Sequence, residues 1–228
     1  LKTCLPRSGF ASTFPQIVFF GPRRYQGAGT FHPWYHQELE KMQVLWQAAS
    51  YQTLVSDMIQ PCVEILRLEL GVPDDITDVP FDLMGKATTK TWIKTVWGSA
   101  QKLGFGIHDQ WAKPTLKRVD DCFLMRVFMD SGKYNALELR TLDDCRMFNH
   151  AITMSDITTA CGRWLLTEAY NGTMKESNLH NYTWPRTQNS LSPKHWALWQ
   201  QALEENFIEY PHNSVRKVLV QPLGQWYQ

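Results

Sequence analysis

Apolar residues recur at helical spacing along most of the chain, and this pattern predicts a mainly helical fold. Over 35–49, apolar side chains fall three or four residues apart, with polar and charged residues between them, which predicts a helix. A second apolar stripe predicts a helix over 53–70, with a kink or a break at Pro61, because proline lacks a backbone N–H. The expected fold class is mainly α, an irregular multi-helix bundle with short β elements near both termini.

Later apolar stripes carry recognisable helix-start signals. Thr88 or Thr89 can cap one helix through a hydroxyl oxygen. Asp120 and Asp121 fall in the first turn of another, where carboxylates suit the helix dipole. Ser192, followed by proline, begins the clearest late helix. The helices predicted in this part of the chain cover 92–103, 119–130, 136–149 (broken) and 192–207, with one helical turn near 155–160.

Both ends of the chain lack this helical spacing. Residues 1–33 are rich in glycine and proline, and their apolar run Gln16–Phe20 is closed by Gly-Pro, which predicts a short strand. Short β-like runs return over 215–227. We therefore expect a connector with a short strand over 1–33 and a helical accessory domain over 34–228.

Composition excludes several classes of protein. Of the 228 residues, 43% are hydrophobic and 13% aromatic, so the chain can bury a core and is not a disordered tail. No run approaches the roughly 18 apolar residues of a membrane span, so we expect no membrane partner. The five cysteines are widely spaced without a C-x-x-C pair, which favours reduced thiols and an intracellular location, nuclear or cytoplasmic.

The net charge of +1 hides alternating blocks. Residues 1–33 carry +4 with no acid, residues 34–85 carry −7, and residues 86–119 carry +6. The two basic blocks can neutralise the phosphates of a nucleic acid; alternatively, they pair with the acidic block inside the fold. The residues that we expect to contact nucleic acid are Arg23, Arg24, Lys86, Lys90, Lys94, Lys113, Lys117 and Arg118.

Four tryptophans lie on two of the helical stripes, at positions 92, 97, 196 and 199. Their positions on apolar stripes favour packing in the core. The alternative is that the rings stack on bases beside the neighbouring lysines.

No motif marks a self-contained active site. The pair Asp120-Asp121 superficially resembles the metal-binding carboxylates of a polymerase, but it opens an amphipathic run and is better explained as a helix cap. A metal-dependent nuclease that uses this pair is the least favoured hypothesis. His32 and His36 are four residues apart, but Pro33 lies between them. We expect no catalytic residue, no metal site and no cofactor in this chain.

Four short motifs, in chain order, resemble those of reverse-transcriptase-like retroelement proteins of the non-LTR type. The segment from Phe20 to Gly29, F-G-P-R-R-Y-Q-G-A-G, resembles the F-G-P-x-x-Y-G-G-x-G segment that follows the polymerase region in that family, with Gln26 in place of the first glycine of the pair. The other motifs are C-R-M-F at 145–148 followed by T-M-S-D-I at 153–157, W-x-x-W at 196–199, and P-L-G-Q-W at 222–226.

The resemblance implies that the chain is the C-terminal, post-polymerase region of a longer reverse transcriptase, an RNA-directed DNA polymerase. The palm carboxylates of that family have no matching positions here, so Mg²⁺ is implied only for the parent polymerase. The implied role is non-catalytic: the chain assists template–primer binding by phosphate contacts, with RNA or DNA and the upstream polymerase domain as partners. The alternative function is a helical scaffold that docks on another protein without binding nucleic acid.

Overall fold

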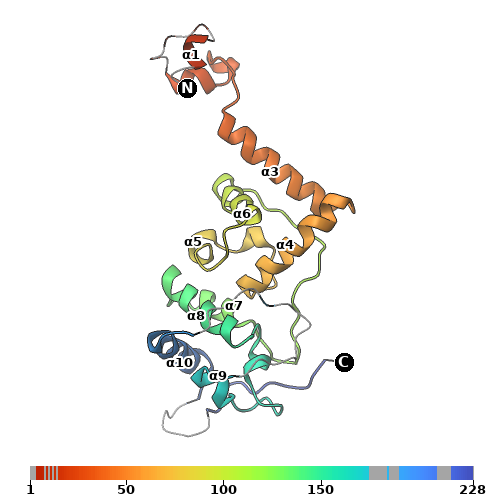
Figure 1. The fold of residues 1–228 in the computed structure, drawn as a ribbon, viewed down its shortest axis with the longest axis vertical. Coiled ribbons are helices and arrows are strands. Elements are labelled where there is room, and N and C mark those ends of the chain that lie inside the picture. Colours follow the sequence, from red (N-terminus) through yellow and green to blue (C-terminus); the bar gives the residue numbers. More distant parts are fainter. Residues whose placement is uncertain are drawn as a thin grey trace. The chain divides into compact units, whose positions relative to one another are not determined.

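The structure is a computed structural model that describes residues 4–7, 9, 11, 13, 15–174, 184, 190–209 and 217–227. It is mainly helical, as the apolar stripes predict (Figure 1). The chain divides into two compact units, Leu1–Val44 and Leu45–Gln228. The boundary falls inside helix α3 (Pro33–Ser50), whereas the sequence placed the end of the connector at residue 33. Among the described residues, no helix is both long and apolar enough to span a membrane.

The first unit contains short helical segments before α3. They are α1 (Cys4–Arg7), α2 (Gln16–Phe20) and the 3₁₀ helix η1 (Arg23–Tyr25). The strand predicted over 16–20 is therefore wrong. The carbonyl of Pro15 accepts hydrogen bonds from the N–H groups of Val18 and Phe19, both at 3.1 Å, which closes a helical turn. A short apolar run does not distinguish a strand from a helix by its spacing alone.

The helices predicted over 35–49 and 53–70 are confirmed as α3 and α4 (Leu54–Leu70). The Thr53 hydroxyl caps α4 by accepting from the N–H of Ser56 at 3.2 Å. Gly71 ends the helix in the left-handed conformation, at φ 64°. The helix runs unbroken through Pro61, so no break occurs there. Pro61 is exposed, and solvent can therefore satisfy the carbonyl that proline leaves without an N–H partner.

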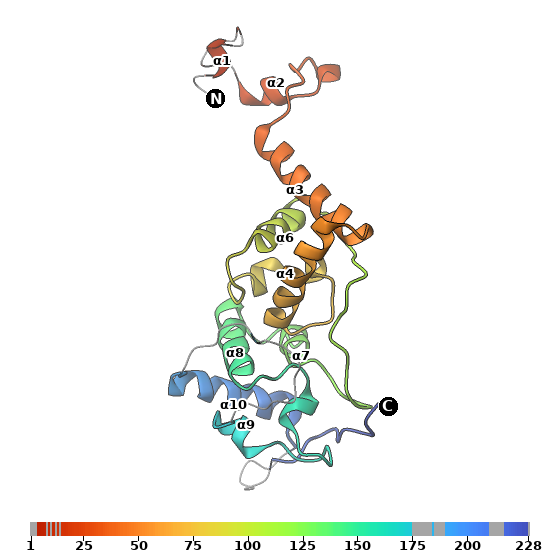
Figure 2. The ribbon, with the colours of Figure 1, turned by 45° about the vertical axis from the view of Figure 1, so that its right-hand side comes forward.

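The second unit continues from α4 with shorter helices that pack on one another (Figure 2). Helix α4 contacts α6 and α8, and α10 contacts α7, α8 and α9. These remaining elements are η2 (Ile76–Asp78), α5 (Phe81–Met84), α6 (Trp92–Leu103), α7 (Leu124–Asp130), α8 (Ala136–Phe148), η3 (Met154–Ile157), α9 (Thr167–Asn171) and α10 (Pro193–Phe207).

Two start signals and the continuity of one helix differ from what the sequence predicts. The cap of α6 is Thr91, which accepts from the N–H of Lys94 at 3.2 Å, rather than Thr88 or Thr89. Helix α7 begins at Leu124, so Asp120 and Asp121 precede it and do not cap its first turn. Helix α8 is continuous rather than broken.

Local capping explains where α8 begins. The side chain of Asn135 accepts from the N–H groups of Leu137 and Glu138, and Glu138 in turn accepts from the N–H of Asn135. This reciprocal capping box satisfies donors that the first turn would otherwise leave unpaired. The helix predicted from Ser192 is confirmed as α10, with proline in its first turn.

The β structure of the described residues is limited to isolated bridges. Near the C-terminus these join Trp164 to Val218, Ile208 to Leu219 and Arg118 to Trp226, all antiparallel. The β-like runs predicted at this end therefore pair with separate segments of the second unit instead of forming a sheet of their own.

Two of the four tryptophans on helical stripes form the centre of the second unit. Trp97 and Trp199 are fully buried, and their indole N–H groups donate to the carbonyls of Val79 at 2.9 Å and Ala169 at 3.0 Å. Trp196 is half-buried against Phe148 of α8. Trp92 is 40% exposed, so its predicted core position is wrong.

A buried arginine joins α8 to the end of α4. Arg146 is fully buried, and it donates to the carboxylate of Asp143 and to the carbonyls of Leu68, Glu69 and Ala151. The carbonyls of Leu68 and Glu69 belong to the last turn of α4, which has no helical N–H partners for them. The arginine of the C-R-M-F motif thus caps the C-terminal end of α4 inside the core, and it does not form a surface site.

Candidate functional site

The segment Phe20–Thr30, which we call the basic turn, folds back on α2 through backbone hydrogen bonds. The N–H of Ala28 donates to the carbonyl of Val18, and the N–H of Gly29 donates to that of Gly21, both at 2.9 Å. At Gly27 a β-carbon would lie 2.1 Å from the carbonyl oxygen of Gly21. Only glycine therefore fits at position 27, because real side chains never approach a backbone atom so closely.

Gln26 occupies the one left-handed position of the basic turn outside its glycines. Its φ is 64°, and its N–H donates to the carbonyl of Arg23 at 3.0 Å. A residue with a β-carbon is strained in this conformation by about 1 kcal/mol. Glycine would adopt this conformation without that strain.

The basic turn exposes both of its arginines. The guanidinium of Arg24 lies 4.8 Å from the centre of the Tyr25 ring, and the stem of Arg23 crosses the space beside Gly29. Neither arginine pairs with a carboxylate of the described residues. Tyr25 is 71% exposed, and Phe31, just beyond the turn, is 76% exposed. The first unit thus displays two unneutralised guanidinium groups beside open aromatic rings.

The six other predicted nucleic-acid contacts belong to the second unit. Lys86 and Lys90 are exposed, and within the described part of the chain neither forms an ion pair. Lys94 is half-buried, and its ammonium donates to the carbonyl of Thr88 at 2.7 Å. Burial, together with the charge of Arg140, holds the pKa of Lys94 below its ordinary value, against the opposing charge of Glu69.

The last three predicted contacts are held by internal partners. The ammonium of Lys113 lies 2.6 Å from Asp75, and that of Lys117 pairs with Asp156. Arg118 is only 3% exposed; its Nε donates to the carbonyl of Gly224 at 2.9 Å, and its guanidinium lies over the ring of Trp226. The sequence left open the alternative that the basic blocks pair with the acidic block. The structure contains such a pair for Lys113. We therefore do not include these three residues among the groups that bind nucleic acid.

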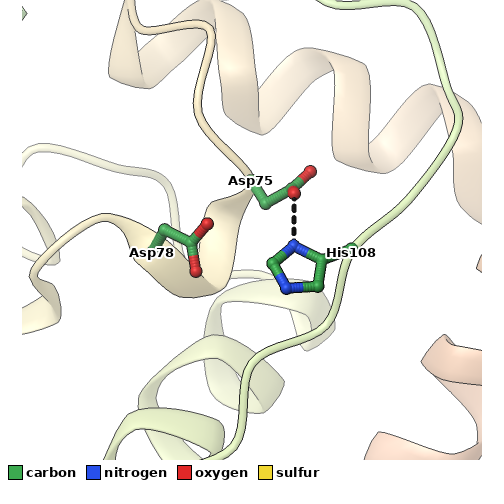
Figure 3. Close-up of side chains that lie close together, drawn as sticks. All are labelled: Asp75, Asp78 and His108. Atoms are coloured by element: carbon green, nitrogen blue, oxygen red, sulfur yellow. Dashed lines mark hydrogen bonds and ion pairs between the residues drawn. The ribbon is translucent and has the colours of Figure 1, made fainter.

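Asp75 lies at the centre of a cluster with Asp78 and His108 (Figure 3). One ligand atom from each residue lies within 4.8 Å of the others, and these residue types bind divalent cations. However, Oδ1 of Asp75 already contacts Lys113 at 2.6 Å and Arg67 at 3.3 Å, and Oδ2 is hydrogen-bonded to Nδ1 of His108 at 2.8 Å. Because both oxygens are occupied, we assign no cation to the cluster.

The cluster instead fastens residues 105–113 to the η2 region. The hydrogen bond and charge of Asp75, with the charge of Asp78, hold the pKa of His108 above its ordinary value of 6.5. Burial would raise the pKa of Asp75, but its contacts with Lys113 and His108 outweigh burial and lower it. Each partner thus favours the charged form of the other. No local pattern predicts this site, because His108 lies 33 residues from Asp75 along the chain.

The two carboxylates of the acidic pair at 120–121 lie in different surroundings. Asp120 is exposed and has φ 60°, whereas Asp121 is buried. The carboxylate of Asp121 accepts from the N–H groups of Lys117, Cys122 and Ser155 at 2.9–3.1 Å. Its oxygens therefore hold backbone segments together, which removes the geometric basis for a two-carboxylate metal site.

Comparisons with known proteins leave the chain without an assigned family. No protein-family model matches it, and no curated protein or solved structure matches it significantly. The retroelement resemblance therefore depends on the four motifs alone, of which the first coincides with the basic turn.

Proposed function

We propose that the chain is a non-catalytic, nucleic-acid-binding part of a retroelement reverse transcriptase, and that the basic turn contacts the backbone of the template–primer. The observation that carries the proposal is the exposure of Arg23 and Arg24 on a turn whose shape is fixed by its glycines. Guanidinium groups bind phosphate oxygens in bidentate fashion, and a preformed turn loses little entropy when they do.

Charge supports this assignment. Residues 1–33 contain four bases and no acid, so no side chain of that segment competes with a phosphate for the arginines. Each phosphate that a base neutralises releases counterions, which makes the affinity depend on salt. Lys86 and Lys90, the exposed lysines of the second basic block, offer further phosphate contacts from the second unit.

Exposed rings beside the arginines favour a substrate with unpaired bases. Tyr25, Phe31 and Tyr35 are each at least about half exposed. Aromatic rings stack on unpaired bases with about 1–3 kcal/mol per base. A duplex with a single-stranded template overhang supplies both phosphates and unpaired bases, and it is the nucleic acid that we expect to bind best.

The test uses the full chain and a fluorescently labelled RNA–DNA hybrid with a single-stranded template overhang. Binding is followed by fluorescence anisotropy between about 50 and 200 mM salt. The double variant Arg23→Ala/Arg24→Ala should weaken binding at least about tenfold at about 0.1 M salt and should reduce the slope of log affinity against log salt by about 2.

A matched control removes two exposed bases outside both basic blocks. The double variant Arg163→Ala/Lys194→Ala changes the net charge equally, and it should leave the salt slope nearly unchanged. The proposal is wrong if the wild-type chain does not bind at about 50 mM salt, or if both double variants lose the same affinity. Absence of binding would favour the scaffold alternative.

A further inference from the structure

Helix α4 has two apolar faces, and only one of them is buried. Val63, Leu66 and Leu70 point into the second unit and are at most 2% exposed. On the opposite side of the helix lie Leu54 and Met58, which are 77% and 68% exposed. A helix that only covers a core carries polar residues on its outer side, so the outer apolar face requires another explanation.

The outer face has the spacing of a helix–helix seam. Its members, which we call the outer seam, are Leu54, Met58, Pro61 and Ile65, and all four are exposed. Their separations alternate between four and three residues, which is the 3.5-residue repeat by which one helix packs along another. In heptad terms Leu54 and Pro61 occupy d positions, and Met58 and Ile65 occupy a positions.

The two flanks of the outer seam differ in charge. One flank carries Asp57 and Glu64, which are seven residues apart and both occupy g positions. The other flank carries Val55 and Cys62 at the e positions, both exposed and apolar. The single base of α4, Arg67, is 1% exposed and is held by Asp75 and Asp109. The outer face of α4 therefore presents acids without any base.

We infer that the outer seam binds an amphipathic helix of a partner protein whose apolar stripe is flanked by lysine or arginine. Residues at e and g positions form interhelical ion pairs and decide which partner binds. Basic residues on the partner would pair with Asp57 and Glu64, while its apolar stripe would cover Leu54, Met58 and Ile65.

The same charges disfavour a second copy of this chain as the occupant. In a parallel pair, Asp57 and Glu64 would face Val55 and Cys62 of the other copy, so the carboxylates would lose solvent without gaining a counter-charge. In an antiparallel pair, the acidic flanks would face each other and repel. A basic helix supplies counter-charges for Asp57 and Glu64, whereas a second copy of α4 does not.

The experiment offers the full chain two synthetic three-heptad peptides with leucine at every a and d position. One peptide carries lysine at its e and g positions, and the other carries glutamate. Binding is measured by anisotropy of a labelled peptide, and the lysine peptide should bind at least about tenfold more tightly than the glutamate peptide. The double variant Asp57→Lys/Glu64→Lys should reverse this preference.

Two single variants separate the outer seam from general surface effects. Met58→Lys should weaken binding of the lysine peptide by about tenfold or more, because it places a charge in the apolar stripe. Leu137→Lys, at a 60% exposed position on α8, should leave binding unchanged. Both positions are exposed, and circular dichroism should show unchanged thermal unfolding for each variant.

Several results would overturn the inference. Equal binding of the two peptides, or no binding of either, would show that the flank charges select no partner. Wild-type affinity in the Met58→Lys variant would place the contact elsewhere. Sedimentation analysis of the chain alone provides the last test: self-association that Met58→Lys abolishes would make a second copy the occupant. None of these results depends on whether the basic turn binds nucleic acid.

Discussion

The basic turn and the segment Lys113–Arg118 show how differently the same residue types are used in two regions of the chain. Both are short basic stretches, and the sequence assigned both to nucleic-acid contact. In the basic turn, Arg23 and Arg24 are exposed and have no described carboxylate partner. In the second region, all three bases have internal partners, namely Asp75, Asp156 and the carbonyl of Gly224.

The difference in exposure depends on whether the fold places carboxylates or carbonyls near the basic side chains. The first 33 residues contain no acid, and the turn is closed by its own backbone, so its side chains are not needed to hold it. Residues 113–118 lie outside any helix. Their backbone pairs with the C-terminal segment at Arg118 and Trp226, and the side chains of their three bases have partners in the second unit. Basic content alone therefore does not predict exposure: the arginines are exposed in the segment that contains no acid, and the bases of 113–118 are held where the fold supplies partners.

The largest effect that separates the two regions should come from Arg118→Ala. Loss of the buried guanidinium leaves the carbonyl of Gly224 without its partner and removes the contact with Trp226. We expect the free energy of unfolding to fall by about 3 kcal/mol, as measured by urea denaturation. Arg24→Ala is the matched control and should change it by no more than about 0.5 kcal/mol. Equal effects of the two variants on stability would show that Arg118 is no more structural than Arg24.

A second, smaller effect should come from Gly27→Ala. The added methyl group overlaps the carbonyl of Gly21, so the basic turn must open and its arginines lose their positions. Nucleic-acid affinity should fall about tenfold, an effect of about 1.4 kcal/mol. Unfolding followed by tryptophan fluorescence should not change, because nine of the ten tryptophans belong to the second unit.

Gly106→Ala is the control for the glycine substitution itself. The nearest atom to its added β-carbon would be 3.9 Å away, an ordinary contact distance, so binding should be retained. In the opposite direction, Gln26→Gly relieves the left-handed strain and should stabilise the turn by about 1 kcal/mol. If Gly27→Ala binds as tightly as the wild type, the shape of the turn has no role in binding.

The helices could be predicted from the sequence because their causes are local. The stripes that form α3, α4, α6 and α10 repeat within one segment, and their end signals lie within a few residues. The failures have non-local causes. The run Gln16–Phe20 forms a helix, and among the described residues no strand pairs with it; Trp92 is 40% exposed although it lies on the apolar stripe of α6.

The candidate site was predictable only in part for the same reason. Arg23 and Arg24 could be identified because their exposure depends on a local turn and on an acid-free segment. Lys113 and Lys117 form ion pairs with Asp75 and Asp156, which lie 38 and 39 residues away in the sequence, so no local pattern predicts these pairs. The rings at Tyr25 and Phe31 were overlooked, although their place in a glycine-rich segment without a helical stripe was a signal that they would not be buried.

A third test compares two lysines of the same basic block. Lys113→Met removes a half-exposed ion pair with Asp75, so the free energy of unfolding should fall by about 0.5–1 kcal/mol while the salt slope of nucleic-acid binding stays the same. Lys86→Met removes an exposed lysine without a described partner, so it should reduce the salt slope by about 1 and leave stability unchanged. The opposite pattern would mean that the internal lysine is the one that contacts phosphate.

The smallest effect is the titration of His108, which reports the Asp75 network directly. In a two-dimensional NMR titration, His108 should have a pKa above its ordinary value of 6.5, because the hydrogen bond and charge of Asp75 favour the imidazolium. Asp75→Asn should lower this pKa toward 6.5, and Asp78→Asn should lower it less, since Asp78 acts through charge alone.

The sign of the linkage follows from the raised pKa. The folded chain binds the His108 proton more tightly than the unfolded chain does, so the contribution of this pair is fully present below about pH 6.5 and is lost as the pH rises through the folded pKa. Asp75 also contacts Arg67 and Lys113, and these contacts hold the same segment. A pKa of 6.5 or lower in the wild-type chain would show that Asp75 does not hold His108, and the internal network that distinguishes residues 105–118 from the basic turn would lose its outermost member.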